Sequence, residues 1–182
     1  TRKRSSAASD VYKRQIDNVL DWAKPHNMYV ILDLHAAPGG QGYNADISDY
    51  DSNKPSLWES EGNQKKTVAL WKKIAQKYKD NEWIGGYDLI NETNWDLPGG
   101  TLLRQLFEQI TVAIREVDKK HIIFIEGNDY ANNYTGLTPP WDDNMVYSFH
   151  KYWSTVNDDD LDWVTPLRDT YNCLLYTSDA AD

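Results

Sequence analysis

The sequence has few cysteines, no long apolar run and an excess of acidic residues. Each of these features excludes or disfavours a class of function. The sequence contains one cysteine, Cys173, so it cannot form a disulfide within the chain. No apolar run reaches the roughly 18 residues that a membrane-spanning helix needs. Basic residues number 19 against 28 acidic ones, for a formal net charge of −9. So acidic a chain is a poor candidate for binding nucleic acid or an anionic membrane surface.

Groups that hold metals or phosphates are also sparse or unsuitably spaced. The four histidines form no His-x-His pair and no cluster with carboxylates at metal-binding spacing, so neither a metal nor a cofactor is predicted. The glycine-rich run "PGGQG" at 38–42 does not open a helix, as a phosphate-binding loop must. We interpret it as a loop at the edge of a substrate cleft.

The two ends of the chain are related to each other in an unusual way. "SSAASDVYKRQ" (5–15) and "CLLYTSDAAD" (173–182) can be encoded by opposite strands of one oligonucleotide, which resembles a sequencing-library adapter. We therefore expect residues 1–15 and 173–182 to be adapter-derived and not native, and we set them aside in reasoning about the fold. Residues 16–172 are expected to form part of one catalytic domain, whose acidic excess is larger still.

Helical and strand-like segments alternate between these ends. Apolar residues at helical spacing predict helices around 16–23, 68–78 and 101–118. Short apolar runs predict strands, buried on both faces, at 28–35, 84–92, 121–127 and 145–153. Strands that alternate with helices of this length form parallel β/α units, so the fold class is predicted to be α/β.

Polar side chains collect where each predicted strand ends. They are Asp33 and His35, Asn91 and Glu92, Glu126 and Asn128, and His150 and Tyr152. A doubly wound sheet usually binds its ligand at one crevice, whereas a barrel builds its site from the carboxyl ends of many strands. Because every predicted strand ends in such residues, we expect a partial TIM (β/α)8 barrel, with about half of the barrel present.

The strand ends resemble those of glycoside hydrolase family 5, the cellulase-type barrels. "VILDLHAAPGGQG" is similar to that family's third strand and loop, and "GGYDLINE" to its fourth strand. "IIFIEGNDY" is similar to the fifth strand and "VYSFHKYW" to the sixth, and the match covers 16–172 in the same order. The resemblance implies a retaining glycosidase, which needs two carboxyl groups about 5–5.5 Å apart.

The resemblance also implies a role for Glu92 as the acid/base. It would first donate a proton to the leaving glycosidic oxygen and then activate water. The family's nucleophile is a glutamate on the seventh strand, and this chain has no counterpart, so we expect the nucleophile to be absent and the fragment to be inactive alone. Glu126 belongs to the fifth strand and is not assigned that role.

Other residues are implied to bind the substrate. Asn91 would bond the sugar 2-hydroxyl, His35 would line the pocket, and His150 would lie beside the acid/base. Tyr152 would hydrogen-bond the nucleophile. The two aromatic residues that follow strand ends, Trp95 and Trp153, are candidate platforms for sugar rings.

The activity that the resemblance implies is that of an endo-β-1,4-glucanase, a cellulase that cleaves β-glucan polysaccharides or oligosaccharides by double displacement. A β-mannanase or β-1,3-glucanase of the same family is the near alternative. A metal-dependent hydrolase on the same barrel and a non-catalytic carbohydrate-binding barrel are more remote alternatives, since a barrel does not fix its function. Polymeric substrates imply a secreted, cell-surface or periplasmic protein, and we expect the complete protein to be a monomer.

Overall fold

The computed structural model describes residues 14–152 and 161–177 of the chain, whose strands form one parallel sheet. The strands lie in sequential order, and each pairs in parallel with the next. They are β1 (Val30–Asp33), β2 (Ile84–Asp88), β3 (Ile122–Glu126), β4 (Met145–Phe149) and β5 (Leu174–Thr177). This order and direction confirm the α/β class and the β/α units that the sequence predicts.

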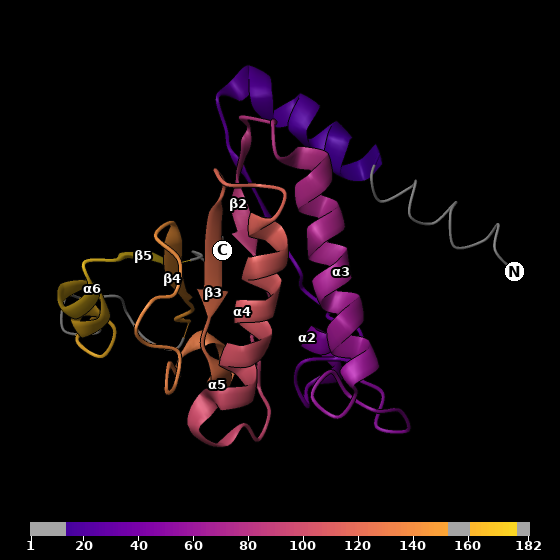
Figure 1. Ribbon diagram of the computed structural model, residues 1–182, viewed down its shortest axis with the longest axis vertical. Helices are drawn as coiled ribbons and strands as arrows, with labels where there is room; N and C mark the ends of the chain where they lie inside the picture. The colour runs from indigo at the N-terminus through magenta and orange to yellow at the C-terminus, as the bar shows by residue number, and fades with distance from the viewer. Residues whose placement is uncertain (1–13, 153–160, 178–182) are drawn as a thin grey trace, which may run out of the picture.

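Helices connect the strands. Residues 14–23 are helical and run into η1 (Lys24–His26). The remaining elements are α2 (Ala45–Ser48), α3 (Glu61–Tyr78), η2 (Pro98–Gly100), α4 (Thr101–Arg115), α5 (Asn128–Ala131) and α6 (Thr165–Tyr171). Figure 1 shows α3 and α4 running side by side along the sheet. The three helices predicted from periodicity are therefore present, with ends that differ by a few residues.

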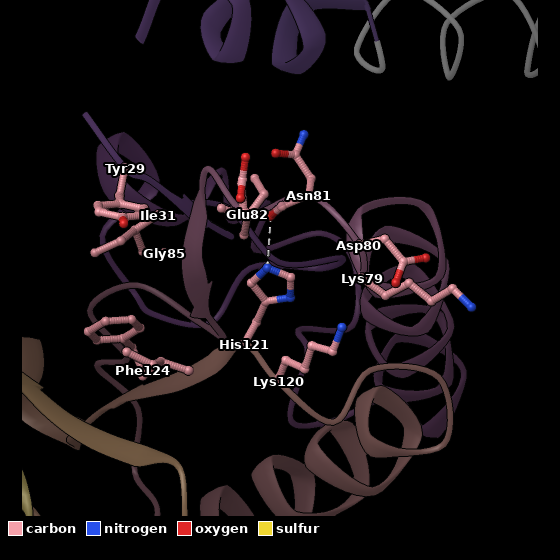
Figure 2. Close-up of a pocket in the computed structure, with 12 residues that line it drawn as sticks. Tyr29, Ile31, Lys79, Asp80, Asn81, Glu82, Gly85, Lys120, His121 and Phe124 are labelled. Carbon is pink, nitrogen blue, oxygen red and sulfur yellow. Dashed lines mark hydrogen bonds between the residues drawn. The ribbon is translucent and has the colours of Figure 1, made fainter. Parts of the chain in front are cut away.

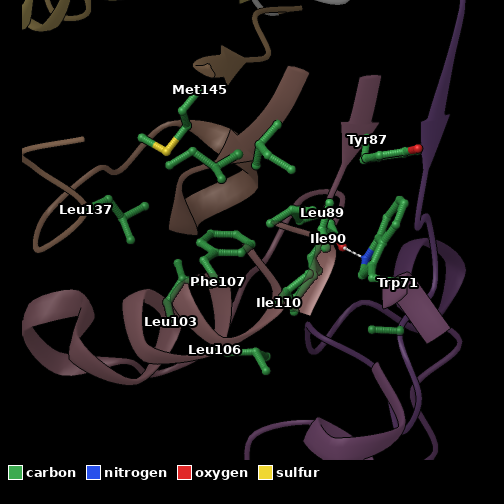
Figure 3. Packing of buried hydrophobic residues seen from close by; sticks show 14 of the residues in the cluster. Trp71, Tyr87, Leu89, Ile90, Leu103, Leu106, Phe107, Ile110, Leu137 and Met145 are labelled. Carbon is green, nitrogen blue, oxygen red and sulfur yellow. Dashed lines mark hydrogen bonds between the residues drawn. The ribbon is translucent and has the colours of Figure 1, made fainter. Parts of the chain in front are cut away.

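The core lies between these two long helices and the sheet. Helix α4 directs one apolar face inward, with Leu103, Leu106, Phe107 and Ile110 all buried. Figure 3 shows this face packed against the residues that continue β2, including Ile90. The strand ends that carry polar residues therefore rest on a rigid apolar support.

Strand β1 differs from its prediction. The sequence predicts a strand buried on both faces, but the residues of β1 are half-buried or exposed, and Met28 and Tyr29 before it are exposed. Within the described residues β1 pairs only with β2, so its outer edge and part of its side-chain surface face solvent. Val19 of the preceding helix is also 42% exposed.

Strand β5 comes from the segment that we expect to be adapter-derived. Residues Leu174–Thr177 pair in parallel with β4, so five strands are described where the sequence predicts four. An unpaired strand edge accepts extended segments that come within reach, so this pairing does not test the origin of the residues. The boundaries 1–15, 16–172 and 173–182 stay a prediction.

A hollow of about 520 Å³ opens at the amino-terminal ends of the strands, away from the predicted site. Figure 2 shows Ile31, Gly85 and Phe124 on one side of it and His121 on the other, where the imidazole is bonded to the backbone of Asn81. Its lining mixes apolar side chains with charged ones, such as Lys79, Asp80 and Glu82.

None of the helices in residues 14–152 and 161–177 is both long and apolar enough to cross a membrane.

Candidate active site

The carboxyl ends of β1 to β4 surround a second hollow, of about 530 Å³. Its lining comes from all four strand ends and from β5. The lining residues are Ile31, Asp33, His35, Asp88, Asn91, Glu92, Glu126, Ser148, His150, Tyr152 and Tyr176. Five of the seven residues that the sequence singles out for substrate binding or catalysis therefore meet in one place.

Glu92, His150 and Glu126 are joined by hydrogen bonds into a closed ring. Oε1 of Glu92 is 2.7 Å from Nδ1 of His150, whose Nε2 is 3.3 Å from Oε1 of Glu126. The backbone N–H of Glu92 donates to the other oxygen of Glu126 at 2.7 Å. The three residues come from the ends of β2, β3 and β4, so the ring holds three strand ends in register with one another.

His150 carries a positive charge in this ring. Its side chain is almost completely buried, which opposes the charge, but hydrogen bonds with Glu126 and Glu92 outweigh burial and raise the pKa of His150 to about 10. Both ring nitrogens therefore donate at neutral pH, one to Glu92 and one to Glu126. The imidazolium fixes the Glu92 carboxyl group and supplies the counter-charge for two neighbouring acids.

The backbone at Glu92 is in a conformation that side-chain-bearing residues rarely adopt. Its φ is +41°, in the left-handed region. Such a conformation costs about 1–3 kcal/mol and persists only where surrounding contacts enforce it. Here the hydrogen bonds to the Glu92 backbone and carboxyl group provide that enforcement, and the strained turn directs the acid into the hollow.

Asn91 offers a free donor to the same space. The residue is 5% exposed, and its Nδ2 has no hydrogen-bond partner among the described residues. A buried amide without a partner is uncommon, because the lost hydrogen bonds to water are not replaced. The position suits an amide that completes its hydrogen bonding on a ligand hydroxyl.

The end of β1 contributes an acid and a histidine. Nδ1 of His35 is 3.0 Å from Oδ2 of Asp33. Partial burial, helped by the nearby charge of Glu126, raises the pKa of Asp33 to about 6 although His35 opposes the rise. Asp88, opposite Asp33 in the β1–β2 register, is buried, and burial together with Glu126 raises its pKa well above the usual range. The hollow is thus lined by acids that retain protons unusually well.

Tyr152 and the two tryptophans occupy different surroundings. The Tyr152 ring lies edge-on to His150, with centroids 5.9 Å apart, and is 54% exposed at the mouth of the hollow. Trp95 does not line this hollow: it stacks on Tyr43 at 4.0 Å and borders a smaller one beside η2. Trp153 lies outside the described residues, so its role as a sugar platform stays a prediction.

Sequence reasoning did not identify several residues that build the site. Glu126 was noted as a strand-end acid, but its bonds to Glu92 and His150 were not predicted. Gln41 was interpreted only as part of a cleft loop, yet its amide bonds to the backbone of Asn91. Asp88 and Ser148 lie inside predicted strands, and the signal that could have found them is a polar residue in an apolar run.

Metal binding has no geometric support in the part of the chain that the structure describes. No three histidine, cysteine, aspartate or glutamate side chains there are arranged so that they could hold a metal ion. Of the two histidines of the hollow, His35 hydrogen-bonds to Asp33, and His150 to Glu92 and Glu126.

Comparisons with known proteins agree with this geometry. Residues 2–175 match the family Cellulase (glycosyl hydrolase family 5). The chain is 36% identical over 143 residues to "Beta-xylosidase" of Phanerodontia chrysosporium, covering 76% of this chain and 29% of that protein. It is 32% identical over 139 residues to "Endoglucanase C" of Acetivibrio thermocellus, covering 75% and 38%.

Solved structures show the same fold. The endoglucanase Cel5A from the hyperthermophilic Thermotoga maritima superposes with a TM-score of 0.69 at 20% identity, covering 92% of this chain and 59% of that one. The chain spans 29% and 38% of the two curated relatives. The family match extends into both ends that we expect to be adapter-derived, and it leaves their origin untested.

Proposed function

The chain belongs to glycosyl hydrolase family 5, and from this membership we propose that it is part of a retaining endo-β-1,4-glucanase whose acid/base is Glu92. The observation that carries the proposal is the position of the Glu92 carboxyl group. It lies inside the hollow at the strand ends, 2.7 Å from His150, with the Asn91 amide beside it.

Both proton transfers of a double displacement are assigned to Glu92, whose carboxyl group lies in the hollow. In the first half its carboxyl group donates a proton to the leaving glycosidic oxygen, and in the second it accepts one from water. The charge of the imidazolium at His150 stabilises the carboxylate left after the first transfer. The unpartnered Nδ2 of Asn91 bonds the sugar 2-hydroxyl, a contact that strengthens in the transition state.

The nucleophile is proposed to come from a glutamate that this chain does not contain. Glu126 is a poor candidate, because its two oxygens already accept bonds from Glu92 and His150 and its side chain is almost fully buried. The length of the chain relative to its relatives agrees with a second carboxyl group supplied elsewhere in the complete protein. Residues 16–172 alone are therefore proposed to be inactive.

The proposed substrate is a β-1,4-linked glucan polysaccharide or oligosaccharide, with no cofactor, no metal and no nucleic-acid partner. Mannan and β-1,3-glucan are the alternatives within the family, because the loops that surround the cleft decide among them. A polymeric substrate of this kind is found outside the cell, so we propose a secreted, cell-surface or periplasmic enzyme that acts as a monomer.

The test is a reducing-sugar assay of the complete protein on glucan, mannan and xylan, with and without a chelator. We expect activity on β-1,4-glucan that survives the chelator, and a fall in kcat of about 10²–10⁴-fold for Glu92→Gln. Glu82→Gln, in the exposed turn before β2, is the matched control and should keep full activity. Failure to cleave any of the polymers, or full activity in Glu92→Gln, would refute the proposal.

A further inference from the structure

The peptide bond between Asn91 and Glu92 is held at both of its polar atoms. Its carbonyl oxygen accepts a hydrogen bond from Nε2 of Gln41 at 2.8 Å. Its N–H donates to Oε2 of Glu126 at 2.7 Å. Because a peptide unit is planar, two bonds at opposite edges leave it no freedom to rotate about its flanking single bonds.

Gln41 is built into the fold as a fixed support. The residue is fully buried, and its side-chain amide makes three hydrogen bonds within the loop and strand ends. Besides Asn91, it donates to the carbonyl oxygen of His35 at 2.9 Å and accepts from the N–H of Ala37 at 3.0 Å. No polar atom of the amide is left to turn toward another partner, so its orientation is determined.

The loop around Gln41 is shaped to bury it. Gly40 donates to the carbonyl of Ala37 at 2.8 Å, with Pro38 and Gly39 between them, which fits a type II turn. Gly39 has φ +89°, and a Cβ there would approach Nδ2 of Asn63 to 2.3 Å. Trp58 then bonds the carbonyl of Gln41 at 2.9 Å. The "PGGQG" run therefore delivers one amide to the end of β2.

The fixed peptide has a direct consequence for the acid. Immediately after it, Glu92 takes its left-handed φ and reaches His150. If the peptide could rotate, the backbone would relax toward an ordinary conformation and the carboxyl group would leave His150. Glu126 accepts from the N–H edge of this peptide and also contacts His150, whereas Gln41 contacts the peptide only at its carbonyl oxygen and does not contact His150.

We propose that Gln41 is a positioning residue for Glu92, acting through the Asn91–Glu92 peptide. The role of this contact in catalysis rests on the proposed function of Glu92. The geometric part does not, because the distance between Glu92 and His150 can be followed in a protein without activity. A role limited to holding the loop together is the competing explanation.

Gln64 provides a matched control for that explanation. It too is a partly buried glutamine whose Nε2 donates to two backbone carbonyls, those of Leu57 and Trp58, at 3.2 and 3.4 Å. It stabilises the same loop but does not contact the Asn91–Glu92 peptide. Replacing each glutamine by methionine removes the hydrogen bonds and keeps a side chain of similar length.

The experiment follows the His150 imidazole by NMR in the complete protein, labelled at histidine, with the signal assigned through His150→Gln. The wild-type titration midpoint should lie near pH 10. In Gln41→Met it should fall by about one unit or more, because one of the two hydrogen bonds to carboxylates is lost. In Gln64→Met it should stay unchanged.

The second measurement is kinetic. On a polymer that the complete protein cleaves, kcat of Gln41→Met should drop about 10- to 100-fold with little change in KM.

The outcomes separate the two proposals. An unchanged midpoint in folded Gln41→Met, or equal shifts in both variants, overturns the positioning role whatever the enzyme's activity. A shifted midpoint in a protein that cleaves no polysaccharide supports the positioning role and refutes the proposed function. If Gln41→Met does not fold, Gln41→Asn, which keeps an amide but is one methylene shorter, is measured in its place. Unfolding of both, with Gln64→Met folded, would show that the residue is purely structural.

Discussion

His150 holds its proton more tightly in the folded chain than in the unfolded one. In the unfolded chain a histidine titrates near 6.5, whereas hydrogen bonds with two carboxylates raise the pKa of His150 to about 10 in the fold. The native state thus holds this proton more tightly, so the stabilisation is complete below about pH 6.5 and is lost as the pH rises toward 10. Asp33 acts in the same direction at lower pH, between about 3.8 and 6.

We therefore expect the free energy of unfolding of the complete protein to decrease between pH 7 and pH 10. Urea denaturation at several pH values in this range measures it, and His150→Gln isolates the contribution of the ring. The difference in stability between the wild type and this variant should shrink as the pH rises. A difference that is constant with pH would show that His150 is not held as an imidazolium.

Among the secondary-structure elements, the link between α3 and β2 fixes the position of the chain just before Asn91 and Glu92. Trp71 of α3 is buried, and its Nε1 donates to the carbonyl of Leu89 at 2.8 Å, two residues before Asn91 (Figure 3). Its ring also packs against Tyr87, with centroids 5.7 Å apart. The helix thereby fixes the strand end from the side opposite to the hollow.

Replacing Trp71 by phenylalanine keeps most of the packing but leaves the Leu89 carbonyl buried without this donor. We expect a loss of about 1–3 kcal/mol in the free energy of unfolding, the usual cost of an unsatisfied buried group. Trp22→Phe is the control, since Trp22 is 69% exposed and should change stability little. Thermal or urea unfolding of the complete protein measures both, and equal effects would contradict the role given to this bond.

For the molecule as a whole, the sheet edges decide whether the segment is stable by itself. In residues 16–172 the strand β5 is removed, so β1 and β4 each keep one unpaired edge. Unpaired edges beside exposed apolar residues such as Met28 and Tyr29 favour association between chains. A barrel avoids this by closing on itself.

We expect residues 16–172 expressed alone to aggregate or to form a molten state. Size-exclusion chromatography, near-ultraviolet circular dichroism and binding of a hydrophobic dye provide the measurement, with the complete protein as the reference. The expected pattern is high apparent mass or strong dye binding without fixed aromatic signals. A sharp, cooperative thermal transition from a monomer would contradict the expectation.

The sequence by itself determined the order of the parallel strands and the residues at their carboxyl ends. Apolar period and segment length are local properties, so they located β2, β3 and β4 and placed Asn91, Glu92 and His150 on one rim. Parallel strands bring their carboxyl ends together, and this general rule was enough to predict a shared hollow.

Only the tertiary structure decided how Glu92 is held. Its partners Glu126 and His150 lie 34 and 58 positions away, and Gln41 lies 50 positions from Asn91. Contacts over such separations depend on strand register and on the path of the 38–42 loop, which leave no periodic trace in the sequence. The same holds for the exposed edge of β1 and for Trp95, whose ring turned toward Tyr43 and away from the hollow. The contacts of Glu92, the exposure of β1 and the orientation of Trp95 all depend on residues that are neighbours in space but distant in the sequence. The apolar pattern of the sequence does not specify such neighbours.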